Sequence, residues 1–129
     1  MAWKWPWQPS SGALVDFGQW KWDVHSHLVP GVDDGAATME DALDMLRGME
    51  ALGYAGMVVT PHVMSDLYPN TPGTLQPAFD AFQSEAKASG IQVELKLAAE
   101  YMMDPHLLEL LRKGPILDIP CTSIPDGKP

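Results

Sequence analysis

The stretch QWKWDVHSHLVPGVDDGA, residues 19–36, combines a strand pattern with a dense group of polar side chains. Residues 19–27 alternate as an extended chain does, because successive side chains of a strand point to opposite faces. One face carries Trp20, Trp22 and Val24, and the other carries Asp23, His25 and His27. The pairs Pro30-Gly31 and Asp34-Gly35 then predict a loop. The stretch therefore predicts a strand that delivers two histidines to the start of a loop.

Strand and helix patterns alternate through the rest of the chain. Thr38, with Asp41 three residues later, predicts a capped helix start, and Gly53 is suited to end that helix. Further patterns predict a strand over 56–60, a helix over 75–88, a strand over 91–97, a helix from Asp104-Pro105 to Gly114, and a strand starting over 116–119. This order predicts an α/β fold with parallel strands and right-handed crossovers. In such folds the functional site lies where strands end and loops begin.

Composition limits the class of protein. The 129 residues are enough for one domain, and an apolar fraction of 46% can form a core. With 8 Lys+Arg against 17 Asp+Glu, the net charge of −9 disfavours nucleic acid and anionic membrane surfaces as partners. No apolar run approaches the roughly 18 residues of a membrane span. The single cysteine, Cys121, excludes a disulfide framework and lacks a nearby basic partner that would make it a nucleophile.

Histidine and carboxylate side chains follow three successive predicted strands. They are His25 and His27 at the end of the first strand, Asp33 and Asp34 in the next loop, His62 after the second strand and Glu100 after the third. Because the carboxyl ends of parallel strands share one rim, we expect these side chains to converge. Imidazole and carboxylate together favour Zn, Mn or Fe, since Mg prefers mostly oxygen ligands. Clustered ions of this kind can bind a phosphate and activate a water near neutral pH.

Taken singly, each of these side chains has an ordinary structural interpretation. An isolated His-x-His is a weak signal, His62 alone suits a loop or a cap, and Glu100 alone suits a solvent-facing position. Only their joint placement favours a metal site. Four acidic residues are interpreted instead as helix and solvent-facing charges: Glu40, Asp41, Asp44 and Glu50. His106, at the start of a predicted helix, is interpreted as a surface residue.

Residues 23–36, DVHSHLVPGVDDGA, resemble the opening motif of the bacterial capsular and exopolysaccharide tyrosine phosphatases of the PHP (polymerase and histidinol phosphatase) superfamily. Three later segments resemble family segments in the same order: 39–64 with its Thr-Pro-His, 66–75 (DLYPNTPGTL) and 97–104 (LAAEYMMD). The resemblance covers about residues 20–119. It implies an α/β fold that is the N-terminal half of a distorted PHP-type (β/α) barrel with parallel strands.

The resemblance also implies a site and an activity. The expected metal ligands are His25, His27, Asp34, His62 and Glu100, and Glu100 is expected to bridge two ions. Asp33 is expected to support a ligand rather than to bind metal itself. The implied cofactor is a cluster of up to three Mn, Fe or Zn ions, and the implied reaction is hydrolysis of phosphotyrosine on proteins. The implied partner is the tyrosine-rich tail of a bacterial autokinase that controls polysaccharide export.

The chain is expected to divide into three parts: a Trp/Pro-rich leader over 1–18, a partial PHP phosphatase domain over 19–119 and a divergent tail over 120–129. The leader lacks the uninterrupted apolar stretch of a signal peptide, so a cytoplasmic protein is expected. Its tryptophans are expected to pack on the domain or a partner, the alternative being a membrane-surface anchor. A half-barrel exposes sheet edges and apolar faces, which predicts self-association.

Two other functions fit the same residues. One is another PHP phosphoesterase, acting on histidinol phosphate or on a nucleic-acid end, although the net charge of −9 disfavours the latter. The other is a truncated, non-catalytic module that binds metal or a partner. An amidohydrolase also opens with His-x-His, but it would not account for the PGVDDG and TPH segments as directly.

Overall fold

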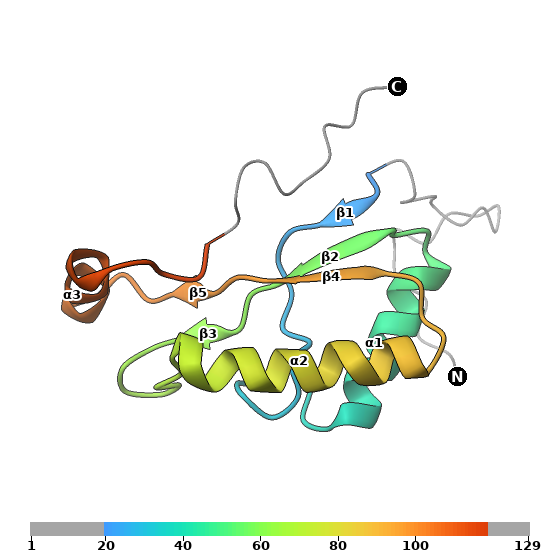
Figure 1. The fold of residues 1–129 in the computed structure, drawn as a ribbon, viewed down its shortest axis with the longest axis horizontal. Coiled ribbons are helices and arrows are strands. Elements are labelled where there is room, and N and C mark those ends of the chain that lie inside the picture. The colour runs from blue at the N-terminus through green and yellow to red at the C-terminus, as the bar shows by residue number, and fades with distance from the viewer. Residues whose placement is uncertain (1–19, 119–129) are drawn as a thin grey trace, which may run out of the picture.

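The computed structural model describes residues 20–118 (Figure 1). Its first sheet has three parallel strands in the order β1-β2-β4, namely Trp22–Asp23, Gly56–Val59 and Glu94–Leu97. A second sheet pairs β3, His62–Val63, in parallel with β5, Glu100–Tyr101. The Ala98 N–H donates to the Val59 carbonyl and the Glu100 N–H to the Pro61 carbonyl, so β3 and β5 extend the path of β2 and β4. The predicted α/β class with parallel strands is confirmed.

Two helices connect strands of these sheets and a third follows β5, and the local sequence explains where each begins. Helix α1 covers Met39–Ala51 and has the predicted capping box of Thr38 with Asp41. Helix α2 covers Pro72–Ala88 and begins before the predicted Leu75, because Thr71 caps it and Pro72 suits its first turn. Helix α3 covers Pro105–Lys113 and is capped by the predicted Asp104. Gly53 follows α1 with a φ of 97°, a left-handed conformation that favours glycine.

The core lies between the first sheet and the pair α1 and α2, which cover the same face of that sheet (Figure 1). Leu46 of α1, Met57 of β2 and Phe82 of α2 are at most 1% exposed. On the opposite face, the Trp22 ring covers Gly56 so closely that a Cβ there would lie 2.5 Å from the ring. Helix α3 lies apart from this core at the end of β5, and none of its residues is buried.

Three strand predictions differ from the structure. The first strand, expected over 19–27, is reduced to Trp22–Asp23 within the described residues. Beyond it the regular pairing with β2 ends: the Ser26 carbonyl still accepts from the Thr60 N–H at 2.7 Å, but the Ser26 N–H donates to the Thr60 side chain instead of to a backbone carbonyl. The strand expected from Ile116 is absent over 116–118, where the Leu117 N–H donates to the Tyr101 hydroxyl at 2.9 Å. The strand predicted over 91–97 is likewise shortened to β4.

The predicted leader over 1–18 and the tail over 120–129, with Cys121, lie outside the described residues. Within residues 20–118, no helix has the length and apolar character needed to cross a membrane.

Candidate metal centre

The predicted site residues converge at the carboxyl ends of the parallel strands. His25 and His27 lie on the extended segment that follows β1. His62 lies in β3 and Glu100 in β5, where the two are direct partners across the parallel pair. These two residues were expected just after longer strands, but they lie within short strands of their own. This register sets their side chains side by side.

One oxygen of Glu100 is the meeting point of three imidazoles. Glu100 Oε2 lies 3.4 Å from His25 Nε2, 3.2 Å from His27 Nε2 and 3.3 Å from His62 Nδ1. The Nε2 atoms of His25 and His27 are themselves 3.2 Å apart. The site is open on one side, since the side chains of His25 and Glu100 are 56% and 40% exposed, whereas that of His62 is 15% exposed.

A second donor group adjoins the first. His62 Nε2 lies 3.3 Å from Asp34 Oδ1, and the Asp34 side chain is 64% exposed. His27, Asp33, Asp34 and His62 offer donor atoms within 4.8 Å of one another, as do His25, His27 and Glu100. His27 belongs to both groups, and its ring centroid lies 4.5 Å from that of His62. The arrangement offers positions for two neighbouring cations.

The side chain of Asp33 is fully buried and holds three segments together. Its Oδ2 accepts hydrogen bonds from His27 Nδ1 and from the His62 N–H, both at 2.9 Å, and its Oδ1 accepts from the Gly35 N–H at 3.0 Å. Burial alone would raise the pKa of the Asp33 carboxyl, but these hydrogen bonds outweigh it and hold the pKa below the usual 3.8. Asp33 is therefore an acceptor near neutral pH, and the proton of neutral His27 lies on Nδ1. The Nε2 lone pair of His27 then faces Glu100.

Thr60 orients His25 from the other side. Its Oγ1 lies 3.3 Å from His25 Nδ1 and accepts the Ser26 N–H at 3.2 Å. The same hydroxyl lies 3.3 Å from the Ser26 carbonyl, so it can accept a hydrogen bond from His25 Nδ1 and donate one to the Ser26 carbonyl. Thr60 is 4% exposed. Thr60 belongs to the Thr-Pro-His segment, but its place in the sequence does not predict a role in the site.

The donor chemistry fits a divalent cation. In neutral His27 the Nε2 lone pair faces a Glu100 oxygen at 3.2 Å, so two acceptors meet with no proton between them. His62 Nδ1 is buried and, although 3.3 Å from Glu100 Oε2, makes no hydrogen bond. A cation between His27 Nε2 and Glu100 Oε2 would satisfy both atoms at once. Neutral His62 has one lone pair, so only one of its two ring nitrogens can bind a cation. A set of imidazoles with carboxylates suits Zn, Mn or Fe.

Of the other charged residues, Asp41 and Asp44 lie on α1 as the sequence predicted, whereas Glu50 has a role in the fold that the sequence did not predict. Asp41 takes part in the α1 capping box, and Asp44 pairs with Arg47 at 2.8 Å on the surface. Glu50 accepts the Gln92 N–H at 2.7 Å. His106 is exposed at the start of α3 and belongs to neither donor group.

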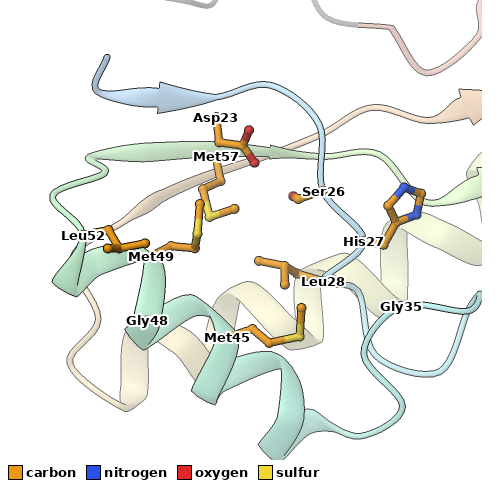
Figure 2. A pocket seen from close by; sticks show the side chains of 10 residues that line it. All are labelled: Asp23, Ser26, His27, Leu28, Gly35, Met45, Gly48, Met49, Leu52 and Met57. Carbon is orange, nitrogen blue, oxygen red and sulfur yellow. The ribbon is translucent and has the colours of Figure 1, made fainter. Parts of the chain in front are cut away.

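An apolar groove of about 690 Å³ lies between α1 and the β1–β2 edge (Figure 2). Its lining includes Leu28, Met45, Met49, Leu52 and Met57, and His27 lies at the end opposite Leu52. The groove meets the donor cluster at His27, and its other lining side chains are mostly apolar.

The sequence pattern of the family described as capsular polysaccharide synthesis, CpsB/CapC, matches residues 21–123. The chain belongs to the CpsB/CapC family. It is 34% identical over 97 residues to the tyrosine-protein phosphatase YwqE of Bacillus subtilis, covering 75% of this chain and 38% of that relative. It is 26% identical over 90 residues to the tyrosine-protein phosphatase CpsB of Streptococcus agalactiae, covering 70% of this chain and 37% of that relative.

A solved structure agrees with this family. It comes from crystal structures of YwqE from Bacillus subtilis and CpsB from Streptococcus pneumoniae, described as metal-dependent tyrosine phosphatases. The match has a TM-score of 0.66 at 26% identity and covers 71% of this chain but 37% of that one. The predicted family resemblance is confirmed, and the chain spans less than two fifths of the CpsB/CapC relatives that it matches.

Proposed function

We propose that this chain carries metal ligands of a metal-dependent protein-tyrosine phosphatase that acts in the control of capsular or exopolysaccharide synthesis. The observation that carries the proposal is the convergence of three imidazole nitrogens on one Glu100 oxygen, each within 3.4 Å. Support comes also from the CpsB/CapC match and from relatives named as tyrosine-protein phosphatases.

The proposed ligands are His25, His27, Asp34, His62 and Glu100. Glu100 is suited to bridge two ions, because its Oε2 faces nitrogens of both donor groups. Asp33 holds the Nδ1 proton of His27 and so keeps His27 Nε2 available as a ligand. We propose a cluster of Mn, Fe or Zn, of up to three ions, as the cofactor.

Each residue has a defined task in hydrolysis of a phosphate ester. Bound divalent cations would supply polarisation of the phosphoryl oxygens and activation of the attacking water. The buried Asp33 and Thr60 hold the histidine rings in place before substrate arrives, so no reorganisation is needed during the reaction. The exposed Asp34 and His25, 64% and 56% exposed, leave the rim accessible to a phosphate carried by a protein side chain.

The proposed substrate is phosphotyrosine in a protein, and the proposed partner is a bacterial tyrosine autokinase. Relatives named as tyrosine phosphatases favour this substrate over histidinol phosphate. A cytoplasmic location and self-association stay predictions.

The first experiment is elemental analysis of the purified 129-residue protein, with phosphatase assays on a phosphotyrosine peptide and on small phosphate esters. The wild type is expected to carry Mn, Fe or Zn. The double variant His25→Ala/His27→Ala is expected to lose it while its circular dichroism is retained. His106→Ala removes an exposed histidine outside both donor groups and serves as the matched control.

Unchanged metal content in the double variant would overturn the ligand assignment. Metal binding without hydrolysis of either substrate class would identify the chain as a non-catalytic metal-binding module. Faster hydrolysis of the small esters than of the peptide would favour the other PHP phosphoesterases.

A further inference from the structure

The segment between β3 and α2 folds back against the metal centre. Met64 and Tyr68 pair through two backbone hydrogen bonds, of 2.9 and 3.1 Å, which close the loop. The Tyr68 ring stacks on the His62 ring, with centroids 5.5 Å apart and an interplanar angle of 13°. The Asn70 N–H then donates to the Tyr68 carbonyl at 2.7 Å. This turn brings the Asn70 side chain back beside β3.

Asn70 joins two segments that each carry a proposed ligand. Its Nδ2 donates to the Val32 carbonyl and to the His62 carbonyl, both at 2.9 Å. A side-chain amide nitrogen has two N–H bonds, so both hydrogen bonds can be made at once. Val32 precedes the Asp33-Asp34 pair, and it lies 38 residues before Asn70 in the chain.

Asp33 completes this connection. The His62 N–H donates to Asp33 Oδ2 at 2.9 Å, while the His62 carbonyl accepts from Asn70. On its other side β3 pairs with β5. The side chains of Asp33 and Asn70 thus satisfy the backbone groups that a neighbouring strand would otherwise satisfy. We call these three hydrogen bonds, from Asn70 to Val32 and His62 and from His62 to Asp33, the brace.

We propose that Asn70 is a positioning residue that sets the separation between Asp34 and His62 and thereby the affinity of their donor group for a divalent cation. The exposed Asp34 carboxylate lies 3.3 Å from His62 Nε2, and the brace fixes the backbone beside both residues. This inference rests on the proposed function, because it takes that donor group to hold a cation.

The chemistry of the amide explains why asparagine serves here. Two carbonyl oxygens must be bound by one neutral group, and an amide nitrogen supplies two donors without adding charge beside the donor cluster. Aspartate would set oxygens against both carbonyls, and leucine has nearly the same shape but no donor. Asn70→Leu therefore removes the brace at Asn70 with little change in volume.

The first test is a titration of the purified chain with Co²⁺, followed by its visible absorption spectrum. Asn70→Leu is expected to raise the Co²⁺ Kd by about tenfold or more, the usual effect of losing an outer hydrogen-bond partner, and to change the Co²⁺ bands. Gln76→Leu is the control, since the Gln76 amide donates to Asp80 at 2.8 Å on the exposed face of α2. The control is expected to match the wild type.

The second test needs no metal. Hydrogen exchange in the metal-free protein, followed by NMR, should show the His62 N–H exchanging at least about fivefold faster in Asn70→Leu, with the Val58 N–H of β2 unchanged. If His62 exchange and the Co²⁺ Kd both stay within twofold of the wild type, the proposal is wrong, even if Asn70→Leu unfolds at a lower temperature. A wild type that binds no Co²⁺ would overturn the proposed function, and His62 exchange would then decide separately whether the brace exists.

Discussion

Replacing Asp33 by asparagine is expected to destabilise the metal-free protein strongly. The carboxylate is 0% exposed and accepts three hydrogen bonds, two at Oδ2 and one at Oδ1. The asparagine side chain has only one oxygen, and it keeps more hydrogen bonds when that oxygen takes the place of Oδ2. The amide nitrogen then faces the Gly35 N–H, which is left buried without an acceptor. This loss, with weaker bonds to His27 and His62 from a neutral oxygen, sums to about 3 kcal/mol.

Urea unfolding in the presence of a chelator measures this loss as a lower free energy of unfolding. In thermal unfolding of a domain of roughly 100 residues, a loss of about 3 kcal/mol lowers Tm by about 12–24 °C. Asp44→Asn is the control, because Asp44 is 68% exposed and pairs only at the surface with Arg47, an interaction worth less than about 1 kcal/mol. A free energy of unfolding for Asp33→Asn within about 0.5 kcal/mol of the control would refute the argument from burial and hydrogen bonding.

Three further predictions follow from single contacts. Gly35→Ala would place a Cβ 2.0 Å from the His27 carbonyl oxygen, so urea unfolding should show a free energy of unfolding lower by about 1–3 kcal/mol. Gly48→Ala is the control, because a Cβ there meets nothing within 4 Å and should not destabilise the protein. Equal stabilities of the two variants would contradict this prediction. Thr60→Val removes the hydroxyl that faces His25 Nδ1, so the Co²⁺ Kd should rise about tenfold. An unchanged Kd would show that this contact does not orient His25 for metal binding. The hydrogen bond from the Leu107 N–H lowers the pKa of Asp104 below 3.8 in the folded protein. The charged carboxylate therefore stabilises the start of α3 fully above pH 3.8, and this stabilisation is lost as the pH falls through the folded-state pKa. The NMR shift of that N–H should titrate below pH 3.8 and lose this titration in Asp104→Asn; a higher midpoint would be inconsistent with the cap.

Local patterns predicted the helices well because their causes are local. The capping contact of Thr38 with Asp41 spans three residues, and Asp104 caps α3 through a residue three positions later. Strand extents were predicted less well. The regular ladder ends after β1, where the Thr60 side chain, 34 residues away, accepts the Ser26 N–H in place of a backbone carbonyl. No window of sequence around residue 26 contains that information.

For the site, the residue types and their order along the chain already indicate that histidine and carboxylate donors follow successive strands. Which atoms face each other follows only from the folded chain: three imidazoles meet at Glu100, Asp33 fixes the Nδ1 proton of His27, and the brace runs through Asn70. The hydrogen bonds from Asn70 to Val32 and from His62 to Asp33 join residues 38 and 29 positions apart, and such partners become neighbours only when the parallel strands are in register.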